Sequence, residues 1–158
     1  MFAKSVSPKL ESARIDYREA LVEQLSGAVR AVWTIACNPP QPVTLALKEV
    51  NQLLQTLEKC LLFGLKTRKK DSQIWPMLNS FGRKVLTPRK SKLAKFVEQA
   101  RKLKISWDRG RAMLRFVLND NLAASLFSWL RSDPSFISRW YRPCSLFAVN
   151  EDIKYITE

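Results

Sequence analysis

A chain of 158 residues, 46% of them apolar, with a formal net charge of +13, has the length and apolar content of one folded domain. It has no histidine, the usual general base near neutral pH and the commonest metal ligand, which excludes histidine-based catalysis and most zinc sites. No apolar run approaches the ~18 residues of a membrane span, and the three cysteines lie far apart, so we expect a cytoplasmic protein without integral membrane insertion.

The chain is predicted to be helical throughout, because it has only four glycines and its apolar residues recur three and four positions apart. The first two predicted helices cover about residues 8–36 and 43–66, with a proline-rich stop between them. The second carries a continuous apolar stripe, which is typical of a core helix. Three helix starts place a capping side chain before a proline: Ser7-Pro8, Thr87-Pro88 and Asp133-Pro134.

Five more helices are predicted beyond residue 70. Four of them cover about residues 72–84, 107–118, 122–131 and 134–141. The other follows Thr87-Pro88 and is expected to bury apolar residues up to Leu103. The helix at 107–118 is apolar nearly all round, which predicts a central position. We therefore predict an all-α fold, a single compact bundle of about seven to eight helices over residues 1–158 with its core in residues 15–150.

The C-terminal end predicts the beginning of a further helix. Asn150 can cap it, and Glu151 and Asp152 in its first turn favour the positive end of the helix dipole. The chain stops soon afterwards at Glu158. We therefore expect a truncated final helix and a fragment of a longer protein.

Positive charge is concentrated in the middle of the chain. Residues 66–111 hold fifteen lysines and arginines but only three acidic residues, which accounts for twelve of the thirteen net positive charges. Such an uneven field favours encounter with a negatively charged partner. Lys92, Lys95, Gln99 and Lys102 share one face of the fourth predicted helix. This face is either the solvated side of the helix or a binding surface, and solvated faces normally mix both signs of charge.

A structural ion pair is predicted for Glu58. This carboxylate lies at the edge of the apolar stripe of the second helix, where it needs a partner. Arg111 and Arg115 are four residues apart on the fifth predicted helix and repel each other unless a negative group lies between them. We expect Glu58 to pair with Arg115 or Arg111. A direct ligand-binding role for the two arginines is the alternative.

Catalytic motifs are missing from the sequence. It has no Walker sequence, dinucleotide fingerprint or nucleophile elbow, so we expect no enzyme, no cofactor and no catalytic or metal-binding residue. Most of the five tryptophans are expected in the core, with Trp140 as a candidate for a contact surface. Gly64 and Gly110 lie in or near predicted helices and indicate close approach between helices rather than phosphate loops.

Four blocks of the sequence resemble the RUN domain in their order and spacing. They are LEKCLLFGLK at 57–66, Ile74-Trp75, RGRAMLRFVLND at 109–120 and WYRPCSL at 140–146. The resemblance covers about residues 15–158 and implies an all-helical bundle, usually of eight helices, that is found in larger multidomain adaptor proteins. Two positions depart from the family, because Phe63 stands where histidine is common and the last helix is cut short.

The resemblance also implies a function. RUN domains act as non-catalytic effectors or adaptors, so the expected partner is a GTP-bound small GTPase of the Rab, Rap or Arf-like group at endosomal, lysosomal, autophagic or other vesicle membranes. The predicted partner-binding residues are those of the basic face and its rim: Arg89, Lys90, Lys92, Lys95, Arg101, Lys102 and Arg109.

Two alternatives stay open at this point. The same basic face could bind nucleic acid or anionic lipid, or the domain could be a scaffold for a coiled-coil or motor partner. Nucleic acid is disfavoured because the aromatic residues lie on apolar faces rather than among the lysines.

Overall fold

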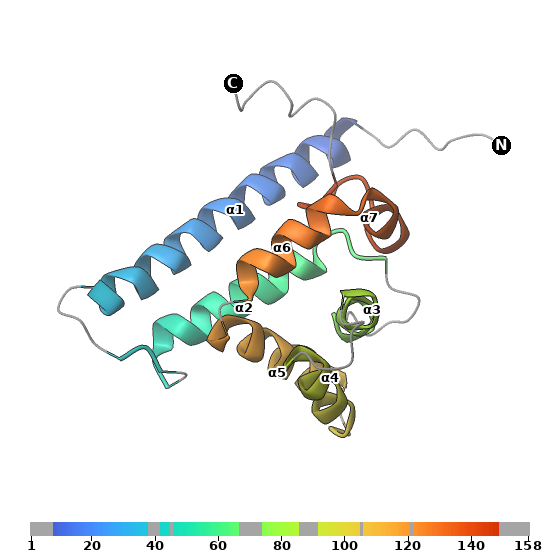
Figure 1. Cartoon of the computed structure of the whole chain (residues 1–158). Coiled ribbons are helices and arrows are strands. Elements are labelled where there is room, and N and C mark those ends of the chain that lie inside the picture. Colours follow the sequence, from blue (N-terminus) through green and yellow to red (C-terminus); the bar gives the residue numbers. More distant parts are fainter. Residues whose placement is uncertain are drawn as a thin grey trace. The chain divides into compact units, whose positions relative to one another are not determined.

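The fold was obtained as a computed structural model, which describes residues 8–37, 42–44, 46–66, 74–85, 92–104, 106–120 and 122–148. These residues form seven helices and no strand beyond a single bridge, which confirms the predicted all-α fold (Figure 1). None of these helices has the length and apolar character needed to cross a membrane. The helices are α1 (Pro8–Cys37), α2 (Lys48–Leu62), α3 (Trp75–Val85), α4 (Lys92–Arg101), α5 (Ser106–Asn119), α6 (Ala123–Ser132) and α7 (Pro134–Trp140).

The chain divides into two compact units. The first comprises Met1–Phe63 with Cys144–Leu146, and the second comprises Gly64–Pro143 with Phe147–Glu158. The prediction of one bundle over residues 1–158 therefore stays a prediction.

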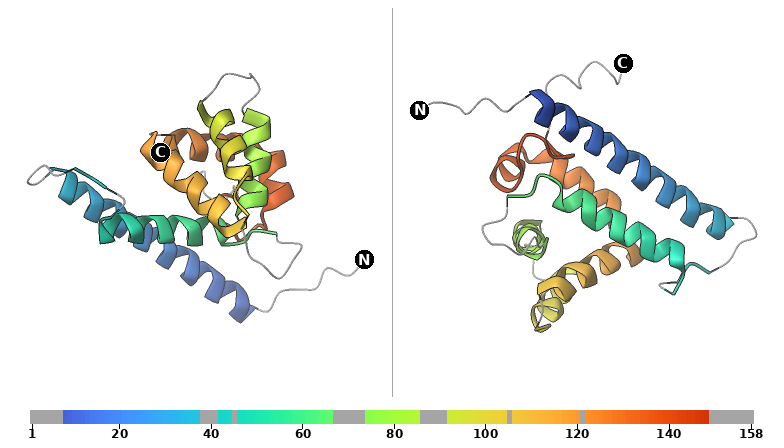
Figure 2. Two further views of the ribbon diagram at one scale, coloured as in Figure 1. Left: turned by 90° about the horizontal axis from the view of Figure 1, so that it is seen from below. Right: turned by 180° about the vertical axis from the view of Figure 1, so that it is seen from behind.

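The first unit is built on α1 and α2, which run side by side in opposite directions (Figures 1 and 2). The ring of Tyr17 near the start of α1 lies 5.3 Å, between centroids, from the ring of Phe63 at the end of α2. The apolar stripe predicted for the second helix is confirmed, since it is buried at Val50, Leu54, Leu57, Cys60 and Leu61. On α1, the side that carries Leu21 and Ala28 is buried.

α2 is shorter than its predicted range of 43–66, and contacts outside the helix determine both ends. Leu47 is extended, with its amide donating to the Thr44 carbonyl, so the helix begins at Lys48. At the other end Gly64 has a φ of 75°, a left-handed conformation that glycine adopts at little cost. The backbone leaves the helical path at this residue, and residues 64–66 pair with a distant segment.

That pairing joins residues 64–66 to residues 140–142 within the second unit. The Lys66 amide donates to the Trp140 carbonyl and the Arg142 amide donates to the Gly64 carbonyl, each at 2.7 Å, around an antiparallel bridge between Leu65 and Tyr141. The Lys66 ammonium also donates to the Ser138 carbonyl. Leu65 and Tyr141, the two residues that form the bridge, are buried.

The rest of the second unit is a packed set of helices. α3 contacts α4 and α5, α4 contacts α5, and the packing continues from α5 to α6 and from α6 to α7 (Figure 2). Asp133 caps α7 as predicted, because its Oδ1 accepts from the Phe136 amide at 3.0 Å and Pro134 takes the first helical position. The buried apolar residues of these helices and the turn before α3 are Ile74, Trp75, Met77, Leu78, Val97, Ala100, Met113, Leu114, Val117, Leu126, Leu130, Phe136 and Ile137.

Gly110 is a point of close approach in the second unit. A Cβ atom at this position would lie 2.8 Å from Cγ1 and 3.3 Å from Cδ1 of Ile74, which is itself buried. The predicted role of Gly110 in close packing is therefore confirmed. A side chain here would push α5 away from the residue that precedes α3.

The helix at 107–118 contacts α3, α4 and α6, in line with its predicted central position, although Arg111 and Arg115 on its outer face are exposed. One prediction about burial was wrong. Leu103 lies beyond the end of α4, so the helical periodicity that predicted its burial no longer applies, and it is exposed. Trp33 on α1 is exposed, so it is not among the tryptophans that lie in the core.

Several predictions concern residues that the structure does not describe. They are the caps at Ser7 and Thr87-Pro88 and the helix expected from Asn150.

The contact at Gly110 makes a prediction about stability. Gly110→Ala should lower the free energy of unfolding by about 1–3 kcal/mol, because the added methyl group overpacks against Ile74. Gly27→Ala is the matched control, since Gly27 lies inside α1 and a Cβ atom added there would meet nothing within 4 Å, and it should raise stability by about 0.5–1 kcal/mol. Denaturant unfolding of both variants measures the difference, and equal effects would contradict the close approach.

Candidate functional site

Six of the basic side chains that the structure describes lie at the end of α4, in the turn after it and on α5. We call this surface the α4–α5 corner and define it as the last turn of α4 (residues 98–101), the turn at residues 102–104, and the charged side chains of α5 from Asp108 to Arg115. It holds six cationic side chains and two acidic ones. The cations are Arg101, Lys102, Lys104, Arg109, Arg111 and Arg115, and the acids are Glu98 and Asp108.

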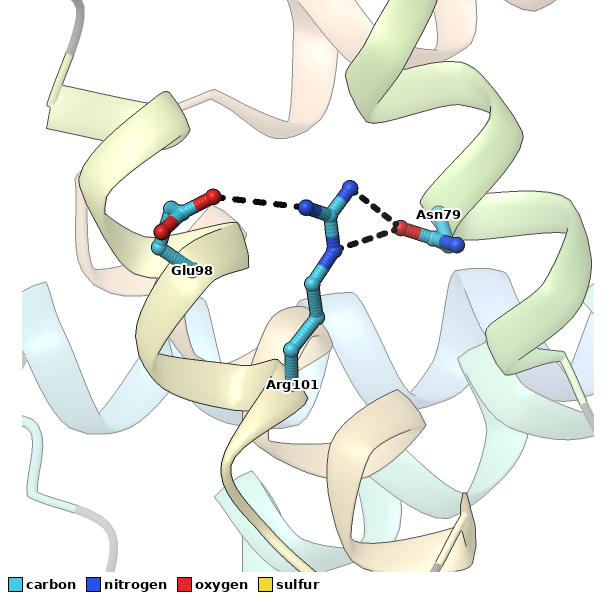
Figure 3. A network of polar contacts seen from close by, with 3 residues as sticks. All are labelled: Asn79, Glu98 and Arg101. Carbon is cyan, nitrogen blue, oxygen red and sulfur yellow. Dashed lines mark hydrogen bonds and ion pairs between the residues drawn. The ribbon is translucent and has the colours of Figure 1, made fainter.

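Arg101 at the end of α4 is held from two sides (Figure 3). Its Nε and Nη2 donate to Oδ1 of Asn79 on α3 at 3.3 and 3.1 Å, and its Nη1 lies 3.3 Å from Oε1 of Glu98. The bonds to Asn79 are partly buried, whereas the Glu98 side chain is 72% exposed. The Asn79 contact is therefore the one expected to hold α4 against α3.

Arg109 near the start of α5 is also engaged inside the second unit. Its Nε donates to the Leu103 carbonyl at 2.6 Å, and its guanidinium carbon lies 6.0 Å from the centroid of the Trp75 ring. The Trp75 ring is buried and presents its electron-rich face to a cation, an arrangement that typically contributes about 0.5–2 kcal/mol. Arg109 thus ties the 102–104 turn to α3 and α5.

The turn itself presents side chains to water. The amides of Lys102 and Leu103 donate to carbonyls three residues earlier, Gln99 and Ala100, each at 3.1 Å, which tightens and ends α4. Lys102, Leu103 and Lys104 are exposed beyond this point. The result is an apolar side chain between two lysines.

The outer face of α5 continues the charged surface. Asp108, Arg111, Arg115 and Asn119 are spaced three, four and four residues apart and all are exposed. The opposite face buries Met113, Leu114 and Val117. Because the spacing places the exposed four on one side of the helix, the two arginines face solvent together.

The predicted partner-binding residues differ in their surroundings. Arg101 and Arg109 have partners inside the second unit, whereas Lys102 is exposed. Lys92 and Lys95 belong to α4, but their side chains lie outside the described residues, as do Arg89 and Lys90.

The predicted ion pair of Glu58 stays a prediction. Glu58 is half-buried on α2 in the first unit, while Arg111 and Arg115 are exposed on α5 in the second unit.

Sequence reasoning missed four groups at the corner. Asn79 and the Trp75 ring hold arginines that lie more than twenty residues away along the chain, and no local pattern predicts such pairs. Lys104 and the exposed Leu103 lie in a turn, where helical periodicity gives no information. The count of charges in residues 66–111 includes Lys104 but does not distinguish it from the other basic residues.

The buried titratable groups offer no reactive nucleophile. Burial raises the pKa of the Cys60 thiol above its ordinary value, and it raises the pKa of the Tyr141 phenol well above its ordinary range. Both groups therefore stay protonated and weakly nucleophilic near neutral pH. Among the described residues, no group of three or more acidic or cysteine side chains is arranged to hold a metal ion.

A comparison with protein families gives one match. The family model described as RUN domain matches residues 52–158, which is more than half of the chain. All four blocks that carry the resemblance lie inside this range. The resemblance was expected to begin at about residue 15, and the residues before 52 lie outside the match. None of the curated proteins with which the sequence was compared matches it.

The matched blocks meet in pairs. The end of the first block, Gly64–Lys66, pairs with the start of the last, Trp140–Arg142. In the same way Ile74-Trp75 packs against Arg109-Gly110 at the start of the third block. These contacts therefore contribute to the framework of the second unit, which carries the exposed residues of the corner.

The two contacts of Arg101 predict different coupling energies. A double-mutant cycle on Asn79→Ala and Arg101→Ala should give about 1 kcal/mol, because the two hydrogen bonds are partly buried. The matched cycle on Glu98→Ala and Arg101→Ala should give less than about 0.5 kcal/mol, since that pair is exposed. Chemical unfolding of the variants measures both, and the opposite order would contradict the anchoring role of Asn79.

Proposed function

The chain belongs to the RUN domain family, and we propose that it is a non-catalytic effector module that binds a small GTPase through the α4–α5 corner. RUN domains are helical protein-interaction modules linked to small GTPases, so membership supports an adaptor role. The observation that carries the choice of surface is the exposure of Lys102, Leu103 and Lys104 in the turn that Arg101 and Arg109 hold.

The arrangement of the corner supports recognition of an acidic protein surface. Arg101 and Arg109 fix the turn from inside, so Lys102 and Lys104 are displayed from a held backbone rather than a free loop. Pre-organised charges of this kind raise the association rate with a partner of opposite charge. Leu103 supplies an apolar contact between the lysines, which charges alone do not provide.

Preference for the GTP-bound state would come from the partner. The switch segments of a small GTPase are ordered by the γ-phosphate and released on hydrolysis. A rigid basic corner binds the ordered switch surface and loses its contacts when the switches become mobile. No change of shape is required of this chain.

The class of GTPase and the cellular site belong to the same proposal. We propose a Rab, Rap or Arf-like partner on endosomal, lysosomal, autophagic or other vesicle membranes. The lipid-anchored GTPase would bring the chain to the membrane surface, with the chain itself in the cytoplasm. Lys92, Lys95, Arg89 and Lys90 would extend the contact from the corner along α4 and to its rim.

A pair of charge reversals tests the surface. Lys102→Glu with Lys104→Glu should slow association with the cognate GTPase at least about tenfold at low salt, because local attraction becomes repulsion. Lys9→Glu with Lys48→Glu is the matched control, since both lysines are exposed in the first turns of α1 and α2 and the net charge changes by the same amount. Stopped-flow or surface-binding kinetics with a panel of Rab, Rap and Arf-like proteins gives the rates.

Three outcomes would contradict the proposal. Equal slowing by the two pairs would assign the effect to net charge rather than to the corner. A second contrary outcome combines two results. The GTPase binds equally well with the GTP analogue and with GDP, and the affinity of the chain for anionic vesicles or nucleic acid falls steeply as salt rises. Together they would assign the surface to those polyanions. Binding of a coiled-coil or motor segment without any GTPase would assign a scaffold role.

A further inference from the structure

α1 has apolar residues on two sides. On one side Leu21 is buried. On another side Ile15, Val22 and Val29 are 53%, 50% and 49% exposed, and Trp33 is 70% exposed. A helix with one buried face ordinarily presents polar residues to water. Four large apolar side chains exposed along one helix therefore indicate an interaction surface.

These four residues form one continuous stripe, which we call the α1 stripe. They are seven, seven and four residues apart, and each of these steps returns a side chain to within ~40° of its starting direction. The stripe from Ile15 to Trp33 is about 27 Å long at the helical rise per residue. A narrow stripe of this length fits another helix laid along α1.

The charge of α1 favours a second copy of this chain as that helix. α1 contains four basic and four acidic residues and is therefore neutral, whereas the whole chain has a formal net charge of +13. The net positive charges of two such chains repel each other. This repulsion is weakest where the neutral α1 helices face each other. An anionic membrane fits less well, because Asp16, Glu19 and Glu23 form an acidic row beside the stripe.

The positions of two charges indicate the direction of packing. Glu19 and Arg30 are exposed and eleven residues apart, a step that places them ~20° from each other on the same flank of the stripe. Their midpoint in the sequence lies between residues 24 and 25, and the midpoint of the stripe lies at residue 24. Two antiparallel copies centred there would place each Glu19 opposite Arg30 of the other copy, with Ile15 opposite Trp33.

We propose that the α1 stripe mediates homodimerisation through antiparallel packing of α1 against α1 of a second copy. The interface has an apolar seam and two symmetry-related ion pairs between Glu19 and Arg30. A single helix pair buries less than the ~1,600 Å² of a standard interface, so we expect a dissociation constant in the roughly micromolar range. This inference does not depend on the α4–α5 corner.

Charge swaps test both the occupant and its direction. Glu19→Arg and Arg30→Glu, each alone, should weaken the dimer at least about tenfold, because each converts two attractive pairs into two repulsive ones. An equimolar mixture of the two variants should recover the association, since each ion pair across a heterodimer then joins an arginine of one chain to a glutamate of the other. Sedimentation equilibrium over a concentration series measures this, with helical circular dichroism as the check that each variant is folded.

The apolar seam and the controls complete the test. Val22→Glu with Val29→Glu should abolish the dimer, whereas Lys102→Glu with Lys104→Glu should leave it unchanged. A wild-type chain that stays monomeric at every concentration would overturn the proposal, and so would a mixture that associates no better than its separate variants. A monomer whose GTPase binding is lost on changing Val22 and Val29 would assign the stripe to that partner instead.

Discussion

Gly110 lets α5 approach the residue before α3 so closely that a methyl group would lie 2.8 Å from Ile74. This approach brings the neighbouring residues, Arg109 and Trp75, into register, so that the guanidinium lies over the indole ring. The same guanidinium holds the Leu103 carbonyl and with it the turn that follows α4. The lack of a side chain at Gly110 thus determines where the turn of the α4–α5 corner lies.

The sequence predicted much of the fold because local rules decide it. Proline with a capping side chain marks the start of α7, and apolar periodicity predicts the buried stripe of α2. The ends of α2 could not be predicted, since its C-terminus depends on pairing of residues 64–66 with residues 140–142. The exposure of Trp33 could not be predicted, because α1 has two apolar sides and periodicity cannot tell which one is covered.

The candidate site was predictable in charge but not in detail. Counting lysines and arginines locates the basic region, and helical spacing places several of them on one face. The same count treats Arg101 and Lys102 alike, although one binds Asn79 and the other is exposed. This distinction depends on which helix packs alongside α4, and only tertiary structure contains that information.

We propose that exposed cations, carried on a framework to which the RUN-domain blocks contribute, recognise the partner. Hydrogen exchange of the chain with and without a GTP-loaded partner tests this claim most directly. Slower exchange on binding is predicted for backbone amides at residues 98–104 and along α5, because the partner covers that surface. Protection confined to α1 and α2, with the corner unchanged, would contradict this assignment.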